Sequence, residues 1–270
     1  MPPRPPVDQA QGLRRLFAHA QVRFVPVVSN PHVAFGGLML ERLCTALAER
    51  DARTLVVDAS ERANAPAEMA LLDLGACIEQ LSSHVSYVAA RGLPLKFVDA
   101  TGSARAFLQA VAVAAPASQV VLVHASAPEL CRLFGRNPQA AEPAACPLLI
   151  ADDHPASVTH AYAAMKLLTQ RAGLMVHELM LGAAGQSPRA ERIARQLGIC
   201  ADDFLGAVLR DWLRIDPATD ASEAPSPALR RWVRTRLGAS AGAALDADTA
   251  FMTAAASPGS RFAASNGAFN

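Results

Sequence analysis

Residues 22–50 read VRFVPVV, SNPHVAFGG and LMLERLCTALAER in succession, and this stretch decides the fold. Val22–Val28 is a run of β-forming residues and predicts a buried strand. Leu38–Arg50 has its leucines at helical spacing and predicts a helix that packs one face on a sheet. Because the loop Ser29–Gly37 joins the two, the stretch is typical of the start of a parallel β-α-β arrangement.

The same order of strand and helix recurs along the chain. Helical spacing predicts three further helices: Arg105–Ala115, Val158–Ala172 and Arg189–Leu197. Short apolar runs predict six further strands: Thr54–Asp58, Val85–Ala90, Leu95–Val98, Val120–His124, Leu148–Ala151 and Leu174–Leu181. Alternation of this kind favours right-handed crossovers and helices on both faces of one sheet. The sequence therefore predicts a single three-layer α/β domain over residues 21–238, with a mostly parallel sheet flanked by helices.

Two segments flank this predicted domain. Residues 1–20 begin with four prolines among the first six residues and predict an extended N-terminal arm, with Asp8 as the N-cap of a short helix. Residues 239–270 consist largely of Ala, Ser, Gly and Thr. Because so little apolar surface cannot offset the entropy of ordering the chain, they predict a flexible tail.

Composition excludes several classes of protein. The 270 residues include 25 Lys and Arg against 24 Asp and Glu, a net charge of +1, which is unlike a protein that coats nucleic acid. No apolar run is long enough for a transmembrane helix, and the first residues contain no apolar run of the signal-peptide type. The five cysteines form no CxxC pair, which argues against a disulfide framework or a zinc site and favours the cytoplasm.

The loop Ser29–Gly37 occupies the position of a phosphate-binding loop, after the first strand and before a helix. A working phosphate-binding loop needs a lysine for the phosphates and a Ser or Thr hydroxyl for Mg²⁺. The chain contains only two lysines, Lys96 and Lys166, and neither is in this loop. Gly36 and Gly37 still leave backbone N–H groups at the start of the helix, which suit a weakly held anion at most.

Five stretches resemble a known family when they are taken together. They are Asp8–Arg14 (DQAQGLR), Leu55–Ala59 (LVVDA), Ala156–Lys166 (ASVTHAYAAMK), Leu174–Leu181, and Phe204–Gly206 (FLG). The chain resembles the MinD/ParA class of deviant-Walker ATPases, and specifically the FlhG (FleN, YlxH) regulators of flagellar number and placement. The resemblance spans about residues 8–238. In Ala156–Lys166, His160 stands where the family has Asp, and the family's later strand ends on Asn.

The departures from this family concern its phosphate and metal ligands. Laid over Ser29–Gly37, the family loop SGKGGVGKT places its signature lysine on Pro31, its Walker lysine on Gly36 and its Mg²⁺-binding Thr on Gly37. The hydrolytic Asp falls on Ser60, and the Walker-B-like strand ends at His124. We therefore expect a pseudo-ATPase with no catalytic residues and no cofactor, with ATP and Mg²⁺ as ligands only if the degenerate site still binds them. The remnant of the nucleotide site comprises Ser29, Asn30, Pro31, Gly36, Gly37, Asp58, Ser60 and His124.

The arm keeps the most specific motif of the family, DQAxxLR. By resemblance, such an arm docks on the FlhF GTPase and helps to arrange the attacking water. The matching residues are Asp8, Gln9, Ala10, Gly12, Leu13 and Arg14. The resemblance also leaves open flagellar basal-body proteins or transcriptional regulators as partners. It implies no binding of nucleic acid.

Two local features have competing interpretations. His32, His124, Asp58 and Ser60 could form a metal or acid–base cluster, but their spacing does not require one, and a structural role is favoured. Ser226–Leu237 predicts a basic amphipathic helix. It is either an interfacial helix on the inner face of the membrane or, as we favour, the last helix that covers the core. Its candidate contact residues are Arg230, Arg231, Trp232 and Arg234.

Two other functions remain open from the sequence. One is an active MinD/ParA-type ATPase whose phosphate contacts are rebuilt with arginines such as Arg42. The other is a partitioning or cellulose-secretion accessory protein with the same fold, for which the arm would have no role.

Overall fold

The structure is a computed structural model that describes residues 22–135, 145–220 and 222–237. The predicted arm at residues 1–20 and the predicted tail at residues 239–270 lie outside the described residues. The chain divides into two compact units, Met1–Leu229 and Arg230–Asn270, and the sheet belongs to the first.

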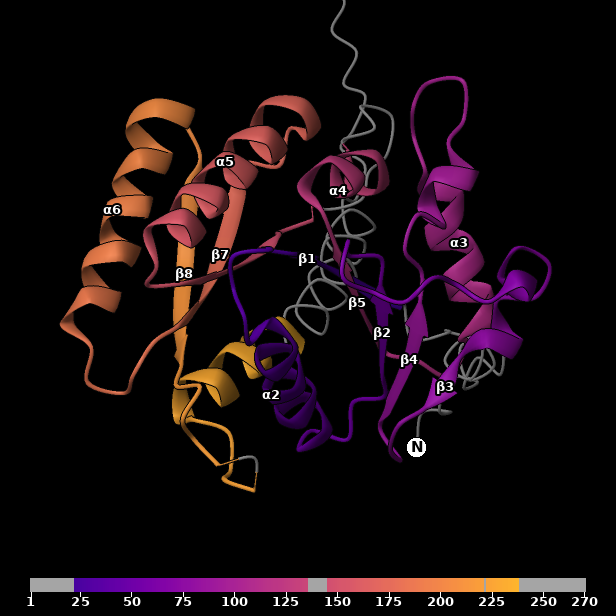
Figure 1. Ribbon diagram of the computed structural model, residues 1–270, viewed down its shortest axis with the longest axis horizontal. Helices are drawn as coiled ribbons and strands as arrows, with labels where there is room; N and C mark the ends of the chain where they lie inside the picture. Colours follow the sequence, from indigo (N-terminus) through magenta and orange to yellow (C-terminus); the bar gives the residue numbers. More distant parts are fainter. Residues whose placement is uncertain (1–21, 136–144, 221, 238–270) are drawn as a thin grey trace, which may run out of the picture. The chain divides into compact units, whose positions relative to one another are not determined.

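An eight-stranded sheet forms the centre of the first unit, in the order β3-β4-β2-β5-β1-β6-β7-β8 (Figure 1). All neighbouring strands are parallel except β3, which pairs antiparallel with β4 at one edge. The predicted mostly parallel sheet is therefore confirmed. The strands are β1 (Arg23–Val28), β2 (Thr54–Asp58), β3 (Glu79–Gln80), β4 (Val85–Ala89), β5 (Val120–Ala125), β6 (Leu148–Asp152), β7 (Val176–Gly182) and β8 (Val208–Ile215).

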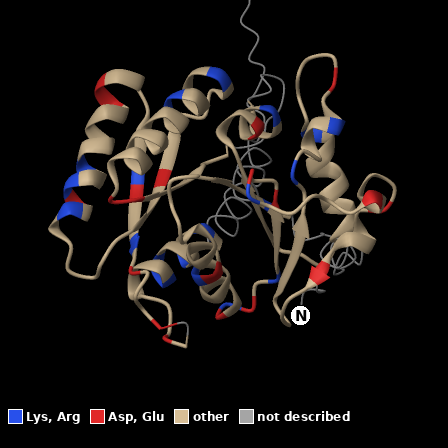
Figure 2. Ribbon diagram, in the orientation of Figure 1, with Lys and Arg blue, Asp and Glu red and all other residues tan. Residues whose placement is uncertain are grey.

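Helices cover both faces of this sheet, which confirms the three layers. In Figure 1, helices α3 to α6 lie on one side and α2 lies on the other. The helices are α2 (Gly36–Ala48), α3 (Arg105–Ala114), α4 (Ala127–Phe134), α5 (Pro155–Ala172) and α6 (Pro188–Leu205). Three short 3-10 helices are η1 (Glu68–Leu71), η2 (Gly75–Cys77) and η3 (Pro94–Phe97). Charged residues lie mostly on the helices, turns and sheet edges, and the middle of the sheet is largely free of them (Figure 2).

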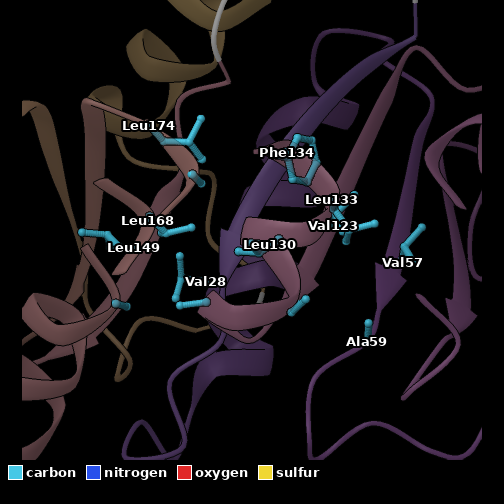
Figure 3. Packing of buried hydrophobic residues seen from close by; sticks show 14 of the residues in the cluster. Val28, Val57, Ala59, Val123, Leu130, Leu133, Phe134, Leu149, Leu168 and Leu174 are labelled. Carbon is cyan, nitrogen blue, oxygen red and sulfur yellow. The ribbon is translucent and has the colours of Figure 1, made fainter. Parts of the chain in front are cut away.

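The main hydrophobic core lies between the sheet and helices α3 to α6 (Figure 3). Val28, Val123 and Leu149 from the central strands meet Leu130 of α4 and Leu168 of α5 there, and each of these side chains is at most 1% exposed. Alternate residues of the same strands point to the other face, where α2 buries its own apolar side. The central strands are thus buried on both faces, as their continuous apolar runs predict.

Pro26 lies in a central strand, where a missing N–H group is normally costly. The backbone N–H groups of Arg23 and Ser29 both donate to carbonyls of the β5 side, so odd-numbered residues of β1 face β5 and even-numbered residues face β6. Strand β6 pairs with β1 only at Val27 and Val28. The missing N–H group of Pro26 therefore faces β6 at a residue where β6 is not yet paired with β1.

Some element predictions need correction. Leu95–Val98 is not a strand, because Pro94 and the turn at Gly92 (φ 72°) start the 3-10 helix η3 instead. Helix α6 continues to Leu205, well beyond the predicted end at Leu197, and is closed by Gly206 in the left-handed conformation. Helix α4 and the strands β3 and β8 were not predicted. The other predicted strands and helices are confirmed, with ends displaced by a few residues.

Candidate functional site at the carboxyl ends of the central strands

The loop after β1 emerges at the carboxyl edge of the sheet, as predicted. Strand β1 lies between β5 and β6, and the Ser29 N–H donates to the carbonyl of Ala125 at the end of β5, at 2.9 Å. The loop then enters α2 at Gly36. In a parallel α/β sheet this edge is where ligands bind.

Asn30 fixes the base of this loop. Its side chain is buried, and Nδ2 donates to the carbonyl oxygens of Ile150 in β6 (2.9 Å) and of Ser157 in the first turn of α5 (3.0 Å). Its Oδ1 accepts from the backbone N–H of His32 at 3.1 Å. Asn30 was predicted to belong to the remnant of the nucleotide site. Its polar atoms instead form hydrogen bonds within the protein.

Arg62 holds the outer side of the same loop. Its guanidinium donates to the carbonyl oxygens of Val33 (3.2 Å) and Pro31. An arginine therefore lies against the loop, but the contact is with backbone carbonyl groups. Sequence reasoning missed Arg62, because nothing in its neighbourhood marks it as a partner of a loop about thirty residues earlier.

The first turn of α2 is open. Phe35 caps the helix without a side-chain hydrogen bond, and the first turn contains no acidic residue. A Cβ atom built on Gly36 or Gly37 would have no heavy atom within 4 Å. Space is therefore open beside both glycines, but at both positions the chain supplies no side chain to hold an anion.

Asp58 and His124 form a pair at the ends of the adjacent strands β2 and β5. His124 Nδ1 lies 3.0 Å from Asp58 Oδ1, and the Ser60 N–H donates to the same oxygen at 3.1 Å. The Tyr87 hydroxyl lies 3.5 Å from Oδ2. Burial acts to raise the pKa of Asp58, but the hydrogen bonds from His124 and Ser60 outweigh it and hold that pKa below its ordinary value.

Of the proposed cluster, the structure brings together Asp58, Ser60 and His124, but not His32. His32 lies beside His160 of α5, with ring centroids 5.7 Å apart. His160 Nε2 is 3.3 Å from the Ser29 carbonyl, and burial lowers the pKa of His160. Among residues 22–135, 145–220 and 222–237, no three His, Cys, Asp or Glu side chains are placed to hold a metal ion.

The predicted basic helix near the C-terminus is present over residues 227–237. Trp232 is 4% exposed, whereas Arg230, Arg231 and Arg234 are exposed. The guanidinium of Arg236 lies 5.2 Å from the centre of the Trp232 ring. None of the helices that the structure describes has the length and apolar character needed to span a bilayer. The arm residues Asp8, Gln9, Ala10, Gly12, Leu13 and Arg14 lie outside the described residues.

Comparison of the sequence with protein-family models gives no match. No curated protein matches the sequence either. Similarity to known proteins is therefore found by comparing folds rather than sequences.

Solved structures share the fold over most of the chain. The cell-division protein MinD of Aquifex aeolicus is 12% identical, with 80% of this chain and 97% of that chain covered and a TM-score of 0.53. Cobyrinic acid a,c-diamide synthase of Mycobacterium smegmatis, with an ATP analogue and magnesium bound, is 12% identical over 80% of this chain and 95% of that one, with a TM-score of 0.55. McdA of Cyanthece, without ligand, is 13% identical over 78% and 90%, with a TM-score of 0.52. The fold is therefore that of the MinD/ParA-type P-loop NTPases.

Proposed function

We propose that the protein is an FlhG-like regulator of flagellar number or placement that acts in the cytoplasm through protein contacts and does not hydrolyse ATP. Its N-terminal arm engages an FlhF-type GTPase, and its α/β domain serves as the scaffold that presents the arm. Flagellar basal-body proteins or transcriptional regulators are further partners within this proposal.

The observation that supports the loss of ATPase activity is the set of groups at the carboxyl edge of the sheet. The positions of the family's two lysines and its metal-binding hydroxyl hold Pro31, Gly36 and Gly37. The carboxylate of Asp58 is engaged by His124 and Ser60. These residues do not fit a magnesium–nucleotide complex, because such a site needs cations for the phosphates and free oxygen ligands for the metal. Each missing charge of this kind commonly costs a few kcal/mol of transition-state stabilisation.

The arm supports the second half of the proposal. The stretch DQAQGLR precedes β1, and six of its seven residues match the family motif. Gln11 is the residue that does not take part in the match. An arm that contributes a water-orienting group to another enzyme needs no ATP chemistry in its own domain. The loss of the phosphate ligands and the retention of the arm are therefore compatible.

The test is the rate of GTP hydrolysis by the cognate FlhF-type GTPase, measured with and without the full chain. We expect stimulation by the wild-type protein and by Gln11→Ala, and a loss of most of it in Gln9→Ala. Deletion of residues 1–20 should abolish it. Equal stimulation by Gln9→Ala and the wild type would refute the role of the arm.

A second candidate is an active MinD/ParA-type ATPase, and two observations favour it. Space is open beside Gly36 and Gly37 in the first turn of α2. Cobyrinic acid a,c-diamide synthase, which has a similar fold, was solved with an ATP analogue and magnesium bound. Calorimetry with ATP and Mg²⁺ separates the two candidates. Tight, magnesium-dependent binding with turnover would replace the pseudo-ATPase proposal. The third candidate, a partitioning or secretion accessory protein, assigns the arm no activity. It therefore predicts that deletion of residues 1–20 has no effect on the rate of GTP hydrolysis.

A further inference from the structure

The connection between β2 and β4, residues 59–84, exposes large apolar side chains. It consists of the 3-10 helices η1 and η2 and the two-residue strand β3, and it contains none of the helices α2 to α6. Ala70 and Leu74 hold it in the hydrophobic core. Four of its side chains are between 54% and 83% exposed, namely Met69, Leu71, Leu72 and Leu81.

Three of these side chains lie together on η1 and the residue that follows it. They are Met69, Leu71 and Leu72, and we call them the η1 patch. Leu72 is the most exposed of the three, at 83%. Single exposed apolar side chains are common, but three within four residues are typical of a surface that another segment covers.

The chain around the η1 patch is acidic. Glu68, Asp73 and Glu79 are exposed, and residues 63–90 contain no Lys or Arg. Among the residues that the structure describes, none of these three carboxylates lies within 4.0 Å of a basic side chain. An apolar surface beside acidic residues favours a segment that is both apolar and basic, and it disfavours an anionic lipid surface.

The N-terminal arm enters the described chain close to this connection. A Cβ atom built on Gly75 of η2 would lie 3.6 Å from the carbonyl oxygen of Ala114, the last residue of α3. The N–H group of Arg23, at the start of β1, donates to the Gln119 carbonyl at 3.0 Å. The connection and the start of β1 therefore both adjoin the short segment between α3 and β5. Nine residues of extended chain span about 30 Å, so residues 13–21 are long enough to reach the η1 patch.

The arm has the composition that this surface favours. It contains three arginines and a single acidic residue. Leu13, Leu16 and Phe17 recur at the spacing of one helix face. Arg14 and Arg15 lie between them in the sequence. An apolar stripe with adjacent positive charges thus matches an apolar patch with adjacent negative charges.

We propose that the arm docks on the η1 patch of its own domain. The apolar stripe of the arm covers the patch, and its two adjacent arginines lie beside the acidic residues around it. Burial of the apolar side chains supplies the affinity, and the charges select the partner segment. Because the arm belongs to the same chain, its effective concentration is high and a modest affinity is sufficient. This docking goes beyond the proposed role of the arm at a GTPase and does not depend on it.

The test is limited trypsin digestion of the full chain, with the loss of residues 1–15 followed by mass spectrometry. Trypsin cleaves after Arg14 and Arg15, and a docked segment is cleaved only when it opens. We expect the double variant Leu71→Gln/Leu72→Gln to lose these residues about tenfold faster than the wild type, because it removes most of the apolar surface that the arm covers. Glu68→Lys should speed the loss about threefold, because it removes one of the attractive charges.

Two control substitutions lie on α6, which packs on β8 at the opposite edge of the sheet. Phe204→Gln replaces an apolar side chain that is 71% exposed, and Glu191→Lys matches the change of charge. Both variants should be cleaved at the wild-type rate, and circular dichroism should show that all variants are folded. Equal rates for the wild type and Leu71→Gln/Leu72→Gln would overturn the proposal. Protection that increases with protein concentration would also overturn it, since the arm would then dock on a second copy of the chain.

Discussion

The aromatic ring of Phe35, at the start of α2, lies directly against Gly182, the last residue of β7. A Cβ atom built on Gly182 would lie 2.2 Å from Cε2 and 2.7 Å from Cζ of that ring, closer than real atoms approach. A side chain is thus excluded at this position, the end of β7. The contact joins the loop after β1 to the far half of the sheet.

This contact predicts a specific response to Gly182→Ala. The new methyl group displaces the Phe35 ring, and we expect a loss of about 1–2 kcal/mol in the free energy of unfolding, in the range for overpacking. The loss should largely disappear in a Phe35→Ala background, which urea unfolding of the four proteins of the double-mutant cycle would measure. Gly36→Ala is the control, because a Cβ atom there meets no neighbour within 4 Å. Additive effects of the two substitutions would contradict the contact.

Arg42 is predicted to stabilise the chain rather than to bind phosphate. It is 5% exposed, and its guanidinium donates to the carbonyl oxygens of Thr219 (2.6 Å), Glu223 (3.0 Å) and Asp220. A lysine cannot reproduce this set of contacts, so Arg42→Lys should lower the free energy of unfolding by about 2–3 kcal/mol. It should also speed limited proteolysis in the segment after β8. The exposed Arg50→Lys is the control and should change stability by less than about 0.5 kcal/mol; an equal loss there would contradict the assignment.

The sheet could be predicted from the sequence because its central strands are buried on both faces and are therefore continuous apolar runs. Strand β8 (VLRDWLRI) is an edge strand in which Arg210, Asp211 and Arg214 interrupt the apolar residues, so its sequence has no such run. Helix α4 has only eight residues, too few for helical spacing to stand out. Leu95–Val98 has a strand-like composition, but Pro94 decides its local conformation.

The site could be predicted in part. Asp58 and His124 each end an apolar run, and parallel neighbours bring such ends together, so their pairing was accessible to sequence reasoning. The contacts of Arg62 with the loop and of Phe35 with Gly182 were not. Both depend on how a loop turns in three dimensions, and neither leaves a periodic pattern in the sequence.

The Asp58–His124 pair predicts a pH-dependent contribution to stability. Because the native pKa of Asp58 lies below its ordinary value of 3.8, its stabilisation is complete above that pH and is lost as the pH falls through the native pKa. His124→Leu removes the strongest of the hydrogen bonds to the carboxylate and should cost about 1–2 kcal/mol at pH 6. The difference from the wild type should narrow below pH 4, as urea unfolding at several pH values would show. A difference that is constant from pH 3 to pH 6 would contradict the role of the pair.

His177 predicts a second, separate pH dependence. It is fully buried in β7, and its Nε2 lies 3.0 Å from the Thr169 hydroxyl, which donates to the Leu174 carbonyl at 3.3 Å. The hydroxyl proton is thus already used, so Nε2 is the protonated nitrogen and donates to Thr169. Nδ1 is buried and has no hydrogen-bond partner among the described residues. Protonation there would bury a charge without an acceptor, and burial accordingly lowers the pKa of His177 to about 4.

The sign of this effect follows from the proton count. Between about pH 6.5 and pH 4 the unfolded chain binds a proton at His177 that the folded chain does not, so acidification favours unfolding. The free energy of unfolding should fall across this window by on the order of 3 kcal/mol. His177→Gln keeps a donor for Thr169 but does not titrate, so its stability should be nearly flat over the same range. If urea unfolding gives the same slope for both proteins, another group is responsible, because the transition of Asp58 lies at lower pH.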